Sequence, residues 1–263
     1  MSWNILASEW IKKSYYPKVN KKILFNRKAR FNKIMKTINQ ENADIIMLQE
    51  VMSLEYKSLK HYLDNKYTIS PLNPIKWKYP KDNKTKNQGE SGNVTFIKKN
   101  ILKNHGIKND SININYQSFE FGIYTQIPND ISVLNIHLDD LSVNTRNKQM
   151  KSIESLLYTT PKCIIGGDFN QPYRKNSKIY NLPEFTIHNT NCPTYYIEEK
   201  MNIDNIMSRG FDKDKDKNKN KNKNKNKNKN KVENEEQCGI YPTTMEEGFE
   251  MYGSDHLPVM IVL

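Results

Sequence analysis

Five short motifs of acidic, amide or histidine residues occur along this chain, and their placement constrains the fold more than any other feature. They are Trp3-Asn4, Leu48-Gln49-Glu50, Asn135-Ile136-His137, Gly167-Asp168-Phe169-Asn170 and Ser254-Asp255-His256. Three of them directly follow or end an apolar run of the β type. Strand ends are where an α/β sheet delivers side chains into a common cleft. The pattern therefore predicts one polar site assembled from residues far apart in the sequence.

The hydrophobic pattern predicts elements on either side of these motifs. Helices are expected at 27–41, 54–63 and 144–158, where apolar residues recur three or four positions apart. Strands are expected at 2–6, 43–48, 92–98, 119–127, 131–136, 162–165, 203–207 and 257–263, with a loop at 71–91 and a turn at 128–130. Because βαβ units alternate with hairpins, the chain is predicted to be α/β, with two packed mixed β-sheets flanked by helices in a four-layer sandwich.

One segment of the chain has a composition unlike the rest. Residues 213 to 231 alternate Lys with Asp or Asn, which accounts for part of the low hydrophobic fraction of 36% and the mean hydropathy of −0.83. The run lies between two expected strands. We therefore predict a single catalytic domain over 1–263, with 212–236 as a disordered, low-complexity, Lys/Asn-rich loop insertion within it.

The charge of the chain is concentrated in this insertion. The net charge is +12, and 212–231 holds ten Lys and three Asp, or +7, which leaves about +5 elsewhere. A basic chain ordinarily suggests a nucleic-acid partner, but here the excess is weak evidence about the folded surface. The run is interpreted as a solvated insertion, with a tether for phosphate backbones as the alternative.

Cysteine usage and the absence of targeting segments indicate an intracellular protein of the cytoplasm or nucleus. Cys163, Cys192 and Cys238 are far apart and odd in number, so neither a zinc site nor a disulfide framework is predicted. No signal peptide is visible at the N-terminus. No apolar run approaches the ~20 residues that a transmembrane helix needs.

The motif set resembles the endonuclease/exonuclease/phosphatase superfamily, and the resemblance runs from Ser2 to Pro258. The stretch Trp3 to Trp10, followed by Arg27 and Arg30, also looks like the deadenylase/nocturnin/Angel branch. The resemblance implies a Mg²⁺-dependent phosphoesterase, with Mn²⁺ as an alternative ion. Independently, carboxylate and amide oxygens at strand ends are the hard ligands that Mg²⁺ prefers.

The resemblance also implies a role for each motif residue. Glu50 would be the principal metal ligand, with Asn4 supporting the metal and Asp255 helping to bind it. Asp168 would orient or deprotonate the attacking water, although His256 is an alternative base. The residues expected to contact the phosphate are His137, Asn170 and His256. Asp204 would orient His256, and Asn93 is a weaker candidate for substrate binding.

The local backbone at the Gly-Gly-Asp-Phe-Asn motif can be predicted as well. Gly166 and Gly167 would let the chain turn sharply after a strand that ends at Ile165. Asp168 and Asn170 would then share one side of an extended segment, because alternate residues of such a segment face the same way. Aromatic residues of the loops, Tyr15 and Tyr16 among them, could stack on bases, although packing within the loops is the favoured interpretation.

Three functions follow from these residues. The favoured one is a metal-dependent phosphodiesterase that acts on nucleic acid. The second is the same chemistry on another phosphoester, such as a 5′-tyrosyl-DNA adduct, an inositol phosphate or a phospholipid, because fold does not settle substrate. The third is a non-catalytic member that binds nucleic acid.

Overall fold

The computed structural model describes residues 1–74, 90–104, 114–127, 131–175, 177–196, 200–211, 242 and 244–263. The predicted insertion at 212–236, the turn at 128–130 and most of the loop at 71–91 lie outside these described residues.

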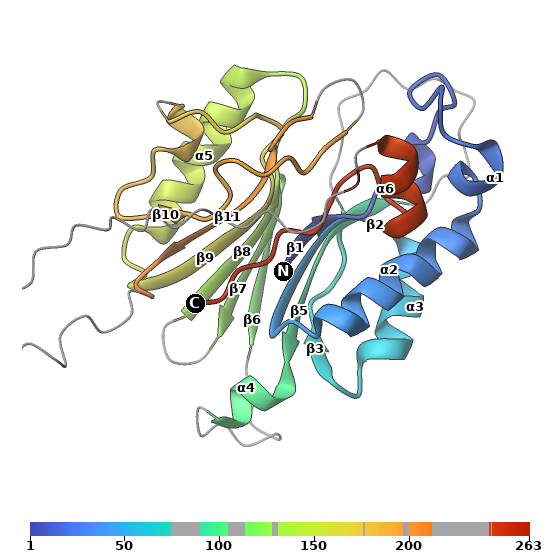
Figure 1. The fold of residues 1–263 in the computed structure, drawn as a ribbon. Coiled ribbons are helices and arrows are strands. Elements are labelled where there is room, and N and C mark those ends of the chain that lie inside the picture. The colour runs from blue at the N-terminus through green and yellow to red at the C-terminus, as the bar shows by residue number, and fades with distance from the viewer. Residues whose placement is uncertain are drawn as a thin grey trace, which may run out of the picture.

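Two mixed β-sheets form the centre of the fold (Figure 1). The first has the strand order β1 (Ser2–Asn4), β2 (Ile45–Met52), β5 (Ser91–Lys98) and β3 (Tyr67–Ile69), with β4 (Asn73–Pro74) also paired to β5. The second has the order β10 (Thr186–Ile187), β11 (Asp204–Arg209), β9 (Lys162–Asp168), β8 (Ile131–His137), β7 (Gly122–Ile127) and β6 (Asn115–Phe119). The β1–β2 and β8–β9 pairs are parallel and the other pairs are antiparallel.

Helices cover the outer faces of both sheets, which confirms the predicted four-layer sandwich. The α-helices are α1 (Lys21–Leu24), α2 (Arg27–Glu41), α3 (Ser53–Leu63), α4 (Lys99–Asn104), α5 (Val143–Leu157) and α6 (Met245–Met251). In Figure 1, α2 and α3 lie on the outer side of the first sheet and α5 lies on the outer side of the second. Short 3₁₀ turns occur at Ser8–Trp10 and Lys178–Tyr180.

The bounds of α2 follow from its caps and its apolar stripe. The side chain of Asn26 accepts a hydrogen bond from the backbone N–H of Ala29 and so caps the N-terminus. Asn42 ends the helix in the left-handed conformation, at φ 46°. Ile34 and Ile38, four positions apart, are both buried against the first sheet. These local signals gave the predicted range of 27–41, and the structure has the same range.

A dry apolar layer separates the two sheets. Its buried members come from facing strands and include Met47, Ile97, Val133, Ile164 and Ile206. Strand residues alternate between this layer and the outer layers, because successive side chains point to opposite faces of a sheet. In β2, for example, Met47 faces the second sheet, whereas Ile46 and Leu48 pack in the cluster that includes residues of α2 and α3.

Gly166 lies where the two sheets approach most closely on the inner face of β9. A Cβ atom at this position would lie 2.3 Å from Cε of Met47 and 3.2 Å from Cβ of Ser2. Gly166 is therefore needed for the packing of the sheets. The prediction that it forms a turn is wrong, because β9 continues through Gly166 and Gly167 to Asp168.

Two other predicted strands differ from the structure. The run 119–127 contains a tight turn at Glu120 and Phe121, so it contributes the end of β6 and the whole of β7. The run 257–263 forms no strand and makes only an isolated bridge between Val259 and Ser2. This single pairing still places the segment beside β1.

Among the described cysteines, Cys163 is free and buried. Cys238 lies outside the described residues. Within the described ranges, no helix has the length and apolar character required to cross a membrane.

Candidate active site

Neighbouring strands bring most of the motif residues to one edge of the sandwich. His137, Asp168 and Asp204 lie in register across β8, β9 and β11, because His137 pairs with Asp168 and Asp168 pairs with Asp204. Asn4 ends β1 in the facing sheet, and its side chain reaches Asp168. Residues from motifs that are far apart in the sequence therefore lie together at this edge.

Asn4 joins the two sheets at the centre of this cluster. Its Nδ2 donates to Oε1 of Glu50 at 2.9 Å and to Oδ2 of Asp168 at 3.1 Å. Its Oδ1 accepts from the backbone N–H of Leu6 at 3.0 Å, which fixes the orientation of the amide. Asn4 therefore acts as a donor that holds two carboxylates in place.

Glu50 is directed into the site by an irregularity in β2. The pairing of β2 with β5 shifts between Leu48 and Val51, so that one extra residue is inserted, and Glu50 adopts φ 58°. Such a β-bulge re-aims a side chain that regular alternation would send to the other face. The backbone N–H of Ala7 donates to Oε2 of Glu50 at 2.8 Å. Burial raises the pKa of Glu50, although nearby His137 and Asn4 oppose that rise.

Asp168 and Asn170 form a turn rather than an extended segment. Asn170 has φ 49°, and its backbone N–H donates to Oδ1 of Asp168 at 2.8 Å. The prediction of an extended segment is wrong because this short-range hydrogen bond favours the left-handed conformation. Burial, followed by the charge of Asp204, raises the pKa of Asp168 to about 7.

Asn170 remains at the rim of the site. Its side chain is only partly buried, and its Nδ2 donates to the carbonyl of Leu138 at 2.9 Å. One amide hydrogen is thus used within the protein. The second hydrogen and the side-chain oxygen have no hydrogen-bond partner among the described residues and can meet a ligand.

His256 is paired with Asp204, as predicted. Its Nδ1 lies 2.8 Å from Oδ2 of Asp204. Burial disfavours the charged imidazole, but Asp204, Asp255 and Asp168 outweigh burial and hold the pKa of His256 well above its usual value. The ring of Tyr195 packs against the imidazole, with centroids 4.7 Å apart. His256 is therefore an oriented, protonated donor at neutral pH.

His137 and His256 direct their Nε2 atoms toward the same carboxylate oxygen. The distances to Oδ2 of Asp168 are 3.6 Å from His137 and 3.8 Å from His256. Burial lowers the pKa of His137, although the charge of Glu50 opposes that effect. The two imidazoles thus differ in character, one favouring the neutral form and the other the charged form.

Asp255 completes the acidic group. It is buried, and its Oδ2 accepts a hydrogen bond from the hydroxyl of Tyr16 at 3.0 Å. The Oγ of Ser254 donates to the carbonyl of Asn4 at 2.9 Å, which anchors the preceding residue to β1. Tyr16 had been grouped with loop aromatics that could contact bases. Its exposure of 2% instead makes it part of the protein interior.

Asn93 does not reach this cluster. Its side chain has no exposed surface, and its Nδ2 donates to the carbonyl of Asn135 at 3.1 Å, between the sheets. The prediction that Asn93 contacts the substrate is therefore corrected, because its whole side chain lies beneath the site. A weak motif match at one position could not distinguish a side chain that faces the substrate from one that is buried between the sheets.

A buried amide pair under the site was missed by the sequence analysis. Gln49 donates through Nε2 to Oδ1 of Asn135 at 2.8 Å, and Asn135 donates to the carbonyls of Leu48 and Val94. These bonds connect β8 to the first sheet below Glu50 and His137. Both residues stood in the quoted motifs, but nothing in a single sequence indicates that two such amides face each other.

The donor set fits a hard cation. Glu50, Asp168, Asp204 and Asp255 come together, and none of them makes an ion pair with a Lys or Arg among the described residues. Oδ1 of Asp204 is buried without a hydrogen-bond partner. Two histidines face Asp168 and Asp204, so four carboxylates meet fewer positive charges than negative ones. A bound cation would offset this excess, and Mg²⁺ prefers such oxygen ligands.

Two arrangements of ligands are available to a cation. Asp168, Asp204 and His256 offer ligand atoms that all lie within 4.8 Å of one another. However, His256 is held protonated by Asp204, and a protonated imidazole repels a cation. Glu50 and Asp255 are the other carboxylates of the cluster, and the charge of Asp255 contributes to the raised pKa of Glu50.

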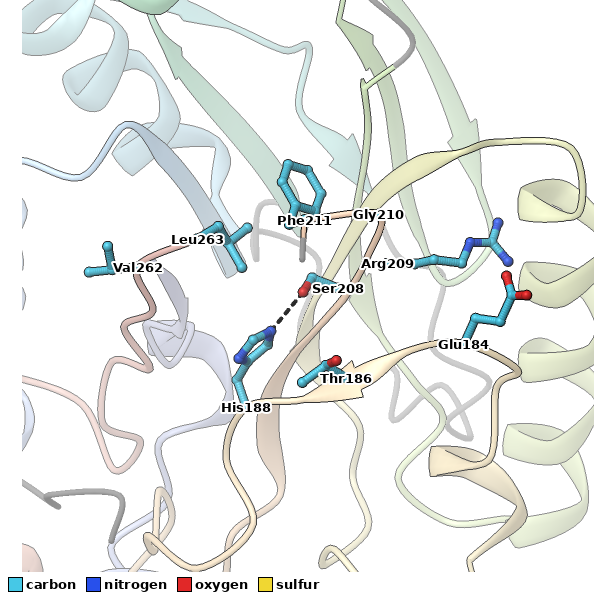
Figure 2. A pocket seen from close by; sticks show the side chains of 9 residues that line it. All are labelled: Glu184, Thr186, His188, Ser208, Arg209, Gly210, Phe211, Val262 and Leu263. Atoms are coloured by element: carbon cyan, nitrogen blue, oxygen red, sulfur yellow. Dashed lines mark hydrogen bonds between the residues drawn. The ribbon is translucent and has the colours of Figure 1, made fainter. Parts of the chain in front are cut away.

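A separate hollow lies at the other end of β11. Its volume is about 150 Å³, and Figure 2 shows Ser208, Arg209 and the C-terminal Val262 and Leu263 along its wall. His188 hydrogen-bonds to Ser208 there, at 2.7 Å. None of the motif residues lines this pocket, so it is distinct from the candidate active site.

Comparison with known structures finds the same fold in proteins of low sequence identity. The catalytic domain of human Nocturnin with bound sulfate is 15% identical, with 78% of this chain and 79% of that one covered at a TM-score of 0.51. ANGEL2 in complex with adenosine-2′,3′-vanadate is 13% identical, with coverage of 79% and 82% at 0.54.

A conserved protein of Enterococcus faecalis V583, described as functionally unknown, is also similar. It is 16% identical, and the match covers 80% of this chain and 86% of that one at a TM-score of 0.53. No curated protein matches the chain by sequence.

The family model described as endonuclease/exonuclease/phosphatase matches residues 1–256. The matched range includes all the motif residues, from Asn4 to His256. The chain therefore belongs to the endonuclease/exonuclease/phosphatase family and is a hydrolase of phosphoester bonds.

Proposed function

We propose that this protein is a Mg²⁺-dependent phosphodiesterase that acts on nucleic acid. The observation that supports this proposal most directly is the meeting of four carboxylates and two histidines at one edge of the sandwich, with no Lys or Arg paired to the carboxylates among the described residues. A phosphodiester is an anion that repels nucleophiles, so its hydrolysis requires charge neutralisation and an activated water.

Each residue has a chemical role in this proposal. Glu50 and Asp255 would hold the cation, and a cation bound there would supply charge neutralisation for the phosphate. Asp168 accepts a proton from the attacking water, and its pKa of about 7 suits a base that works near neutral pH. Asn4 holds Asp168 and Glu50 at a fixed separation.

The histidines supply hydrogen-bond donors for the phosphate. The Nε2 atoms of His256 and His137 converge on one region beside Asp168, so both can donate to oxygens of a phosphate placed there. Asp204 keeps His256 protonated and oriented. Asn170 contributes its remaining amide hydrogen from the rim.

Features near the site favour a polynucleotide as the substrate. Tyr15 is 50% exposed beside the buried Tyr16, and Nζ of Lys12 lies 5.4 Å from the centre of its ring. An exposed aromatic ring next to a cation suits a base and its phosphate. The fold also accommodates a nucleotide in one relative, since ANGEL2 is described as a 2′,3′-cyclic phosphatase in complex with an adenosine derivative.

The test is hydrolysis of a labelled panel with Mg²⁺, with Mn²⁺ and with EDTA. The panel holds single-stranded RNA with a poly(A) tail, abasic duplex DNA, plain DNA, a 5′-tyrosyl oligonucleotide, an inositol phosphate and a phospholipid. Asp168→Asn is compared with Asp64→Asn, which makes the same change at an exposed residue that follows α3.

We expect metal-dependent cleavage of a nucleic acid by the wild type and by Asp64→Asn, and a loss of about 10²-fold or more in Asp168→Asn. Cleavage of the inositol phosphate or the phospholipid alone would keep the chemistry but overturn the substrate class. Binding of nucleic acid without cleavage of any substrate would favour a non-catalytic role.

A further inference from the structure

The hydroxyl of Tyr16 makes a single contact inside the candidate site. It donates to Oδ2 of Asp255 at 3.0 Å, and both side chains are almost completely buried. Asp255 thus has one oxygen, Oδ2, held by the Tyr16 hydroxyl. Its other oxygen, Oδ1, lies 3.5 Å from Oγ of Ser254, which is a weak contact because the Ser254 hydroxyl also donates to the carbonyl of Asn4 at 2.9 Å.

The ring of Tyr16 packs against the ring of Phe249. The two rings meet edge to face, with centroids 5.3 Å apart, and Phe249 is fully buried. On the far side of Phe249 lies the guanidinium of Arg30, 5.9 Å from the ring centre. The position of the hydroxyl is therefore determined by packing, and only the hydroxyl itself contacts the acidic group.

Arg30 attaches this aromatic pair to the two segments that carry the site residues. Its Nε donates to the carbonyl of Gly253 at 2.6 Å, and its Nη2 donates to the carbonyl of Ile5 at 3.0 Å and to that of Leu6. Ile5 directly follows Asn4, and Gly253 directly precedes Ser254-Asp255-His256. The same buried residues thus hold both segments and the ring that contacts Asp255.

Gly253 permits this close approach. Its φ is +78°, and a Cβ atom there would lie 2.8 Å from the carbonyl oxygen of Arg30. The backbone before Asp255 therefore rests directly on α2, and little freedom remains for Asp255 except rotation of its carboxylate. The hydroxyl of Tyr16 is placed to restrict that remaining rotation.

We propose that Tyr16 is a positioning residue of the active site, which acts through Asp255 by fixing one carboxylate oxygen so that the other faces a divalent cation. This inference rests on the proposed function only in taking Asp255 as a ligand. Residues that orient a metal ligand typically change metal affinity by about 10- to 100-fold when the orienting group is removed.

The adjacent tyrosine provides a matched control. Tyr15 packs edge to face on Tyr16, with centroids 6.5 Å apart, but it is half-exposed and its hydroxyl has no hydrogen-bond partner in the described part of the chain. Tyr16→Phe and Tyr15→Phe each remove one hydroxyl and keep the ring. A difference between the two variants therefore reports the contact with Asp255.

The experiment measures Mg²⁺ binding by calorimetry and Mn²⁺ binding by EPR, without substrate, for the wild type, both variants and Asp255→Asn. We expect Tyr16→Phe to raise the Kd about 10- to 100-fold and Tyr15→Phe to change it less than about 2-fold. Tyr16→Phe should have no further effect in the Asp255→Asn background, because the two side chains act through one contact. Thermal unfolding confirms that each variant is folded.

Activity supplies a second, separate readout. Hydrolysis by Tyr16→Phe should need more Mg²⁺ for half-maximal rate and should approach the wild-type kcat at saturating Mg²⁺. An unchanged Kd in a folded Tyr16→Phe protein would overturn the inference and leave the proposed function intact. A wild type that binds neither ion would overturn both, whereas a wild type that binds the ions but cleaves no nucleic acid would overturn only the proposed function.

Discussion

At the scale of single residues, His256 shows how neighbours decide a protonation state. Burial alone would favour the neutral imidazole, but Asp204 lies 2.8 Å from Nδ1, and Asp255 and Asp168 are also close. The carboxylates together raise the pKa of His256 well above its usual value. The proton on this ring therefore depends chiefly on one identifiable contact.

Asp204→Asn should lower the pKa of His256, because the amide keeps the shape of the side chain but removes the largest of the charges that oppose burial. When the pKa of a histidine is higher in the folded state than in the unfolded state, its protonation adds to the free energy of unfolding. This contribution is complete at a pH below the unfolded-state pKa and disappears as the pH rises through the folded-state pKa. The free energy of unfolding should therefore fall less steeply with rising pH in the variant. NMR titration of the His256 ring in EDTA, together with urea unfolding, measures both effects.

The control for this prediction is Asp64→Asn, which removes a carboxylate from an exposed position. It should leave the titration of His256 as in the wild type. If the pKa of His256 were unchanged in Asp204→Asn, Asp204 would not be the main group that raises this pKa against the effect of burial.

The sequence predicted contacts within the site only for residues that belong to the motifs. The pairing of Asp204 with His256 was expected from the resemblance and is present. The left-handed backbone at Glu50 and Asn170 was not expected, because it arises from a bulge against β5 and from a hydrogen bond to Asp168. Such details depend on partners that a local pattern does not identify.

At the scale of elements, β9 shows that a glycine inside a strand can allow two sheets to pack closely against each other. The structure leaves no room for a methyl group at Gly166, because Met47 from β2 fills the space opposite. The sequence analysis had interpreted the same glycine as a turn, since glycine favours turns when only the chain itself is considered.

Gly166→Ala should lower the free energy of unfolding by about 1–3 kcal/mol, because the added methyl group overpacks the interface between the sheets. Met47→Leu alone should cost less than about 1.5 kcal/mol. The double variant should recover part of the loss, since the leucine removes the end of the methionine chain that the methyl group meets. Urea unfolding of the four proteins measures the coupling, and strict additivity would contradict the proposed clash.

Elements with strong local signals matched their predicted ranges, and those defined by distant partners did not. The range of α2 was predicted from its apolar stripe, and the caps Asn26 and Asn42 directly flank that range. The segment 257–263 has a strand-like sequence, but it makes only one isolated bridge, at Ser2, and one further backbone hydrogen bond, from Leu257 to Thr194, among the described residues, so it stays irregular. A sequence pattern indicates the capacity to pair but not whether a free strand edge is available.

At the scale of the whole molecule, the strongly basic run lies outside the described residues. Deleting 213–231 removes ten Lys and two Asp from a chain with a net charge of +12. We expect kcat, KM and the salt dependence of KM to stay within about 2-fold of the wild type, because the site residues come from other segments. A higher KM with a flatter salt dependence would instead identify the run as a tether for phosphate backbones.

The arrangement of the site also affects the order of events during folding. Ser254 contacts Asn4, and Trp3 contacts His256, across sequence separations of 250 and 253 positions. Contacts between such distant positions form slowly, because most of the chain must first be confined. A nascent or partly folded chain would therefore carry the acidic residues without their geometry. Hydrolytic competence should thus appear as a late step of folding.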